Sequence, residues 1–101
     1  MLLLSLFAAA LTVAQPAPQP AALDAAASLA QPGEARRLIL DGRSWSCGPD
    51  GACVARGSGA SQPVMRECRR FVARFGAVTR YERDGVALST DELARCNAAA
   101  N

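Results

Sequence analysis

Residues 36–56 have the sequence RRLIL-DG-RSWSC-GPDG-ACVAR, in which two turn signals separate three short segments. Asp41-Gly42 is among the strongest hairpin dipeptides, because both positions of a tight two-residue turn require a positive φ. Gly48-Pro49-Asp50-Gly51 is a second turn cluster. We therefore predict antiparallel strands over residues 36–40, 43–47 and 52–56.

A long helix is predicted after these strands. Apolar residues recur there at the spacing of one helix face: Val64, Cys68, Phe71, Val72 and Phe75. Pro63 suits the first turn, with Ser61 or Gln62 as the cap, and Gly76 ends the helix. A second Asp-Gly dipeptide, at 84–85, then predicts a hairpin between residues 77–83 and 86–88.

A terminal helix from about Thr90 to Cys96 has the clearest local signature. Ser89 and Glu92 have the spacing of a capping box, with Leu88 and Leu93 placed as a hydrophobic staple. The predicted element order is therefore β-β-β-α-β-β-α. This is an α+β domain, with one long helix packed on a small antiparallel sheet whose strand order the sequence leaves open.

The folded domain is predicted to span residues 35–97, with residues 98–101 as a frayed tail. Its predicted core consists of Leu38, Ile39, Leu40, Trp45, Val54, Val64, Phe71, Val72, Phe75, Val78, Tyr81, Val86, Leu88 and Leu93, with Met65 at its border. A core of this size makes the domain marginal without covalent support.

The residues before the domain predict export. Leu2 to Val13 is an apolar run of about a dozen residues, whereas a transmembrane helix needs roughly 20. We predict a signal peptide over residues 1–14, although the usual positive charge before the apolar run is missing, which leaves open a start further upstream. Residues 15–34 are predicted to be a flexible Pro/Ala-rich tether. The expected location is periplasmic or secreted, with no transmembrane span.

Four cysteines in a small exported chain indicate two disulfides. Cys47 and Cys53 straddle the tight turn between adjacent predicted strands, so we predict that they pair. Cys68 and Cys96 would then join the long helix to the terminal one, while the two rival pairings would tie the hairpin to the helices. The spacing matches neither a C-x-x-C redox motif nor the paired cysteine knuckles of a zinc site.

The composition excludes several chemistries. The chain has no histidine and no lysine, and all 11 basic residues are arginines. Histidine-based triads, histidine-ligated metals, Schiff bases and P-loop lysines are therefore excluded. Six of the seven acidic residues of the domain occupy turn, capping or arginine-flanked positions: Asp41, Asp50, Asp84, Glu92, Glu67 and Glu82. We predict that the protein is not an enzyme and has no catalytic residue, cofactor or metal site.

The long helix carries arginines at helical spacing: Arg66, Arg70 and Arg74, with Arg69 beside them. With Asp24 and Glu34 assigned to the tether, the domain has 11 arginines against 7 acids, about +4. One interpretation is a solvated face opposite the core. The other is a binding site for an anion, because the arginine fork binds phosphate or carboxylate in a bidentate manner. No aromatic residues interleave these arginines, so nucleic acid is not expected.

Trp45 is the only tryptophan and lies two residues before Cys47, on the same face of its predicted strand. It is interpreted either as a core side chain that covers the disulfide or as a recognition aromatic at the surface. The sequence leaves both interpretations open.

Three pieces of the sequence carry a family resemblance: Trp45-Ser46-Cys47 with Cys53 after five intervening residues, the lone helix residue Cys68, and the ending Leu93-Ala94-Arg95-Cys96-Asn97. They resemble a family of small, uncharacterised exported proteins of alphaproteobacteria over roughly residues 36–97. The resemblance implies export and four paired cysteines. It implies no activity and no functional residue.

These observations favour a non-enzymatic binding module of the cell envelope. Its expected partner is an anionic envelope component or an envelope protein, docked through Arg66, Arg69, Arg70 and Arg74. The alternative is a small inhibitor or regulator of an envelope enzyme that acts through the disulfide-pinned loop Gly48–Ala52.

Overall fold

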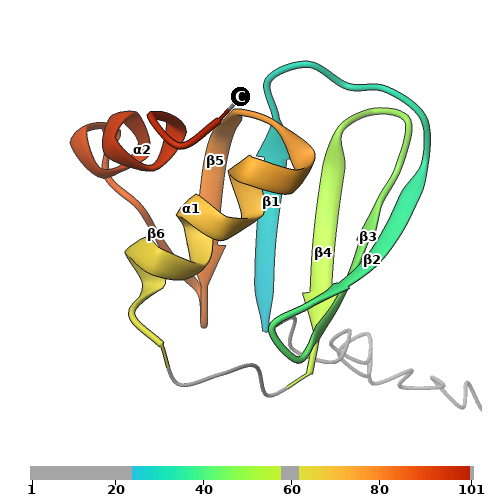
Figure 1. Ribbon diagram of the computed structural model, residues 1–101, viewed down its shortest axis with the longest axis horizontal. Coiled ribbons are helices and arrows are strands. Elements are labelled where there is room, and N and C mark those ends of the chain that lie inside the picture. The colour runs from blue at the N-terminus through green and yellow to red at the C-terminus, as the bar shows by residue number, and fades with distance from the viewer. Residues whose placement is uncertain (1–23, 58–61, 101) are drawn as a thin grey trace, which may run out of the picture.

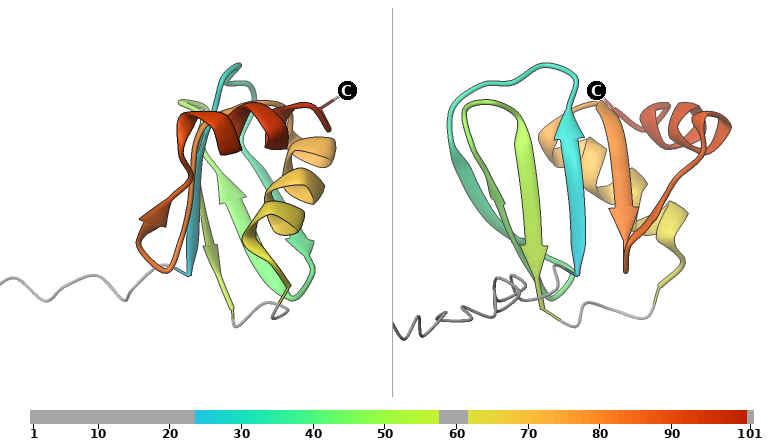
Figure 2. Two further views of the ribbon diagram at one scale, coloured as in Figure 1. Left: turned by 90° about the vertical axis from the view of Figure 1, so that its left-hand side faces the viewer. Right: turned by 180° about the vertical axis from the view of Figure 1, so that it is seen from behind.

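A six-stranded antiparallel sheet carries two helices on one of its faces in the computed structural model, which describes residues 24–57 and 62–100 (Figure 1). The strands are β1 (Ala25–Leu29), β2 (Arg36–Leu40), β3 (Arg43–Cys47), β4 (Ala52–Arg56), β5 (Val78–Arg83) and β6 (Val86–Ala87), and the helices are α1 (Val64–Phe75) and α2 (Thr90–Asn97). Figure 2 shows that no described element covers the opposite face, which we call the open face. The predicted α+β class is confirmed, as are both hairpins and both helices.

The strand β1 corrects the predicted tether. The sheet order is β2-β3-β4-β1-β5-β6, so β1 lies in the middle and pairs with both β4 and β5. Ala25 and Ala27 are buried beneath the helices. Alanine has a low intrinsic preference for strands, so local sequence does not predict β1, and its pairing with two neighbours places it. The domain therefore includes residues 24–34 of the predicted tether, while residues 1–23, with the predicted signal peptide, lie outside the described residues.

Aromatic side chains form the centre of the core between the sheet and α1. The Phe71 ring lies 4.5 Å from Trp45 and 5.8 Å from Tyr81, measured between ring centroids. Three predicted core residues are wrong. Val54, between the buried Cys53 and Ala55, lies on the open face outside the core cluster. Ile39 and Val86 are 77% and 70% exposed. Both lie on the outermost strands of the sheet, and Ile39 belongs to the open face, where the sheet has no packing partner.

The disulfides Cys47–Cys53 and Cys68–Cys96 confirm both predicted pairings. Cys47 and Cys53 are directly opposite in the β3–β4 register, with Cα atoms 4.0 Å apart. Cys68 and Cys96 join α1 to α2 across a Cα separation of 5.8 Å. All four are buried, so each disulfide also belongs to the core.

The helix ends follow the sequence signals with one difference. Ser89 and Glu92 form the predicted capping box of α2, and the hydrogen bond from the Ser89 backbone lowers the pKa of Glu92. Gly76 ends α1 at a φ of 110°, a value that favours glycine. Pro63 is itself the cap residue of α1, whereas it was predicted inside the first turn with Ser61 or Gln62 as the cap.

Candidate functional site

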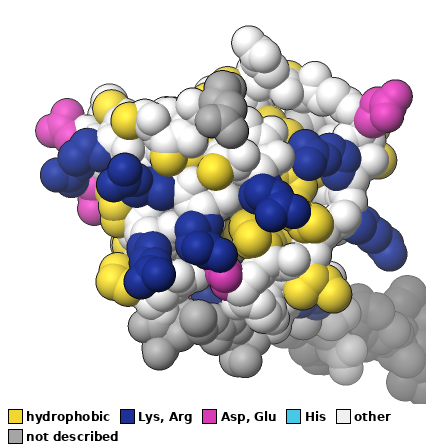
Figure 3. All heavy atoms as spheres, in the orientation of Figure 1, with side chains coloured by type: hydrophobic (Ala, Val, Ile, Leu, Met, Phe, Trp, Pro, Cys, Tyr) yellow, Lys and Arg dark blue, Asp and Glu magenta, His cyan; other side chains and the backbone are white. Residues whose placement is uncertain are grey.

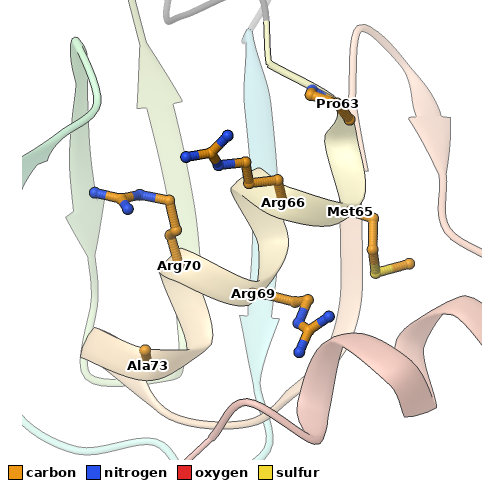
Figure 4. Close-up of a pocket in the computed structure, with 6 residues that line it drawn as sticks. All are labelled: Pro63, Met65, Arg66, Arg69, Arg70 and Ala73. Atoms are coloured by element: carbon orange, nitrogen blue, oxygen red, sulfur yellow. The ribbon is translucent and has the colours of Figure 1, made fainter.

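The outer face of α1 presents all four arginines of the predicted site. Arg66, Arg69, Arg70 and Arg74 are exposed, as expected for residues opposite the buried face of an amphipathic helix. Figure 4 shows Arg66 and Arg70 extending toward one side of the helix and Arg69 toward the other side, near α2. Figure 3 shows that arginine side chains are spread over this face of the molecule, with few acidic ones among them.

A shallow hollow of about 480 Å³ lies between these arginines. It is lined by Pro63, Met65, Arg66, Arg69, Arg70 and Ala73. Three of the four predicted arginines thus share one surface, and apolar side chains separate their guanidinium groups. Arg74 lies one turn further along and lines a smaller hollow of about 180 Å³ with Leu40, Arg70 and Ala73.

Arg70 is the one predicted site residue with a partner in the described chain. Its Nε donates to Asp41 Oδ2 at 2.7 Å, and Gln62 Nε2 donates to the same oxygen at 3.3 Å. The hydrogen bond from Arg70 holds the pKa of Asp41 below its usual value, with smaller contributions from Gln62 and Arg66. Within residues 24–57 and 62–100, Arg66 and Arg69 make no ion pair. The guanidinium groups of Arg66 and Arg69 are therefore available to an anion, one on each side of α1, while the hollow between them is lined mainly by apolar groups.

The charge of the domain is lower than predicted, because Asp24 belongs to the fold. Its Oδ2 accepts a hydrogen bond from the Gly57 amide at 2.6 Å, and its carbonyl accepts one from the Asp84 amide. With Asp24 and Glu34 included, the 11 arginines face 9 acids, which gives +2. The basic character of α1 is therefore a local property rather than a property of the whole domain.

A buried polar cluster lies on the opposite side of α1. Glu67 is 3% exposed and Arg43 is 5% exposed. Glu67 Oε1 accepts from Arg43 Nε at 3.2 Å and from the Tyr81 hydroxyl at 2.7 Å, while Arg83 Nη1 lies 3.5 Å from Oε2. Burial raises the pKa of the Tyr81 hydroxyl far above its ordinary value, and the bond to Glu67 raises it further.

The sequence contained a signal for this cluster that our prediction did not use. Glu67 lies three residues after Val64 and four before Phe71, so the helical period places it on the apolar face. Arg43 shares the inward face of its strand with Trp45, because strand side chains alternate. An acid and an arginine at two inward positions predict a buried pair.

The cluster connects Glu67 to both ends of the segment between β4 and α1. Arg43 Nη1 donates to the Gly57 carbonyl at 2.8 Å, and Arg83 Nη1 donates to the Gln62 carbonyl at 2.6 Å. Every buried side-chain nitrogen and oxygen in the described residues has a hydrogen-bond partner. The cluster therefore positions the start of α1, and with it the arginines on the outer face of the helix.

Trp45 is not a recognition aromatic at the surface. It is 1% exposed and packs against Phe71 and Tyr81, which supports the core interpretation. The loop Gly48–Ala52, the site of the alternative function, is a tight turn in which the Gly51 amide donates to the Gly48 carbonyl. Pro49 and Asp50 are its exposed tip.

Two further features are absent from the described part of the chain. In residues 24–57 and 62–100, no three histidine, cysteine, aspartate or glutamate residues are grouped as a metal ion would require. None of the helices described there has the length and apolar character needed to cross a membrane.

The chain belongs to a family of unknown function, DUF8200, whose model matches residues 6–98. Comparison with curated proteins gives no significant match, and comparison with solved structures gives none either.

Proposed function

We propose that the protein is a non-enzymatic binding module of the cell envelope that docks an anionic partner through the outer face of α1. The observation that carries this proposal is that Arg66 and Arg69, which flank the hollow on the outer face of α1, make no ion pair with any described residue. Here the acids of α1 and its neighbours are directed elsewhere: Glu67 into the core and Asp41 to Arg70.

The arrangement suits a phosphate or carboxylate group. Each free guanidinium can donate two parallel hydrogen bonds to such a group. Arg70 is held in place through its Nε by Asp41. One exposed ion pair is worth only about 0–1 kcal/mol, so several arginines must act together. Such binding decreases as salt increases, because the charges are exposed and screened.

The proposed location is periplasmic or secreted. Two disulfides are supporting evidence, because disulfides persist in oxidising compartments. The apolar run at residues 2–13 and the resemblance to exported alphaproteobacterial proteins support the same location. A lipid phosphate, an acidic envelope polymer and an acidic protein surface are the anions available there.

Cosedimentation with phosphatidylglycerol vesicles and retention on immobilised polyglutamate test the proposal, with phosphatidylcholine vesicles as the neutral reference. We expect Arg66→Gln/Arg69→Gln to lose at least about tenfold in affinity for whichever anionic probe the wild type binds. The matched control is Arg56→Gln/Arg80→Gln, which removes the same charge from exposed positions on β4 and β5. Equal losses in both double variants, or no salt-dependent binding by the wild type, would overturn the proposal.

The alternative function, inhibition or regulation of an envelope enzyme, is favoured by the rigidity of the loop Gly48–Ala52. The Cys47–Cys53 disulfide closes its base, and Asp50 Oδ1 accepts from the Ala52 amide at 3.0 Å, so two local constraints restrict the exposed tip. Replacing Pro49 and Asp50 while keeping the disulfide removes partner binding under this alternative. The same replacement leaves anion binding by α1 unchanged.

A further inference from the structure

The two edges of the sheet differ in length and in what they expose. β6 has two residues, whereas β2 has five residues that all pair with β3 on one side only. Short edges are a common protection against strand addition, and long open edges are a template for it. In the described residues, no strand or helix pairs with the outer side of β2.

The register identifies the free backbone groups of β2. Leu40 pairs with Arg43 across the tight turn at Asp41-Gly42, whose φ values are 49° and 83°. In such a hairpin the residues flanking the turn exchange hydrogen bonds, and the pattern alternates along the strands. The N–H and C=O groups of Leu40, Leu38 and Arg36 therefore point to β3, and those of Arg37 and Ile39 point outward.

The side chains along this edge combine basic and apolar groups on both faces of the sheet. On the helix face, Arg36 lies with its guanidinium carbon 4.7 Å from the Phe75 ring centroid, and its Nη2 donates to the Arg74 carbonyl at 3.2 Å. Leu40 lines the small hollow beside Arg70 and Arg74. On the open face, Arg37 is exposed next to Ile39, so basic and apolar groups alternate along both faces of the edge.

We propose that the outer edge of β2 binds an extended, acidic segment of a partner protein as an additional antiparallel strand. The outward groups of Arg37 and Ile39 supply the main-chain hydrogen bonds, the mode by which many domains bind peptides. Acidic residues of the segment face Arg36 and Arg37, and an apolar residue packs on Ile39. The inference goes beyond the proposed function, because the backbone of β2 makes the primary contacts rather than Arg66 and Arg69.

Charge complementarity favours this partner over a second copy of the chain. β2 contains two exposed arginines, Arg36 and Arg37, and no acid, whereas Arg43 of β3 is buried and paired with Glu67. Pairing two β2 edges would bring Arg36, Arg37 and Arg74 of both copies to one interface without an acid on either strand. Like charges at a sheet interface are destabilising, whereas an acidic strand neutralises them.

The probe is the peptide Thr-Glu-Val-Val-Glu-Glu-Thr. Paired antiparallel with β2, it places glutamates opposite Leu40, Arg37 and Arg36, and valines opposite Ile39 and Leu38. Amide hydrogen exchange of the full, oxidised chain is the measurement. Without peptide, the Arg37 and Ile39 amides exchange rapidly and the Leu38 amide slowly. With peptide at millimolar concentration, we expect exchange at Arg37 and Ile39 to slow by about tenfold or more.

Two matched changes separate strand addition from simple charge attraction. A peptide N-methylated at the valine opposite Ile39 keeps every charge but loses one main-chain donor, so it should not protect Arg37 or Ile39. Ile39→Pro removes only the outward amide and is tolerated on an edge strand, whereas Ile39→Thr keeps that amide. We expect the proline variant to lose binding and the threonine variant to keep it within a few-fold.

Three results would overturn the inference. They are absence of protection at millimolar peptide, equal binding of the N-methylated peptide, and a wild-type dimer that Ile39→Pro dissociates in sedimentation. The N-methyl comparison uses the wild-type protein, so it decides the question even if the proline variant does not fold. Arg66→Gln/Arg69→Gln should still bind the peptide, so failure here and failure of the proposed function are distinguishable.

Discussion

Two groups of arginines lie on opposite sides of α1 and have different roles: one group pairs with a buried carboxyl group, and the other is exposed to solvent. Arg43 and Arg83 reach from the sheet to the buried carboxyl group of Glu67, and they also donate to backbone carbonyls at the two ends of the segment between β4 and α1. Arg66 and Arg69 point into solvent from the outer face, without an ion pair in the described chain. The amino-acid composition does not distinguish these side chains. They differ in how deeply the fold buries them.

This difference shows that the surroundings of an arginine in the fold decide its role. A buried arginine supports the structure, whereas an exposed one is available to bind a ligand. Removing a charge from water is expensive, so a buried arginine requires a complete set of partners. Arg43 has that set in Glu67 and Gly57. An exposed arginine remains hydrated and can exchange water for a ligand at little cost. The predictions below test this contrast from the largest effect to the smallest.

Glu67→Gln should have the largest effect on stability. It keeps the shape of the side chain but leaves the buried Arg43 without its counter-charge, which is expected to cost about 3–5 kcal/mol in the free energy of unfolding. Urea denaturation of the oxidised protein measures the loss. Glu82→Gln is the matched control, because it makes the same chemical change in the exposed pair with Arg80. Equal losses of unfolding free energy in the two variants would mean that the buried Glu67 pair contributes no more to stability than the exposed Glu82 pair.

Alkaline titration should show the next largest effect. Tyr81 is the only tyrosine, and its pKa is raised in the folded state above its ordinary value of 10. Above about pH 10 the unfolded chain releases a proton that the folded chain keeps, so stability falls by about 1.4 kcal/mol per pH unit. The tyrosinate absorbance band should therefore appear only as the protein unfolds. A titration near pH 10 in the folded protein would contradict the buried cluster.

Asp41→Asn should cost less than about 1 kcal/mol, the usual range for an exposed ion pair. Asparagine accepts the φ of 49° at this turn position, so the hairpin is kept. Because the pKa of Asp41 is lowered, its contribution to stability is present above the ordinary value and is lost as the pH falls below it. The variant also releases Arg70, so affinity for the anionic probe should increase. Unchanged or weaker binding would exclude Arg70 from the site.

Arg66→Gln and Arg69→Gln should change the free energy of unfolding by no more than about 0.5 kcal/mol each, as is usual for surface substitutions. Anion binding should nevertheless fall. Thermal and urea denaturation measure the first quantity and cosedimentation the second. A large loss of stability in either variant would mean that these arginines, like Arg43, have a structural role.

The sequence predicted the local features of this fold well. Both hairpins follow from Asp-Gly dipeptides at positions of positive φ, at Asp41-Gly42 and Asp84-Gly85. The capping box at Ser89 and Glu92 located the start of α2. The helical period located the buried face of α1, and the positions of the cysteines on adjacent elements predicted both disulfides.

The candidate site was predicted only in part. The spacing of Arg66, Arg69 and Arg70 placed them on one exposed surface, because the helical period is a local property. The same pattern did not show that Asp41 holds Arg70, since that contact joins two elements distant in the chain. The sequence left open whether Trp45 lies in the core or at the surface. Its packing against Phe71 in the structure shows that it is a core residue.

By itself, the sequence determined where most strands and helices begin and end and which face of α1 carries the arginines, and it favoured the observed pairing of the cysteines over two rivals. These features depend on neighbouring residues, through turn conformation, capping and helical period. Only the tertiary structure decided that β1 lies in the middle of the sheet, that β2 is an open edge, and that Glu67 is buried among Arg43, Tyr81 and Arg83. The reason is physical: the small side chains of β1 have little strand preference of their own, and a buried charge is stable only where distant elements bring its partners together.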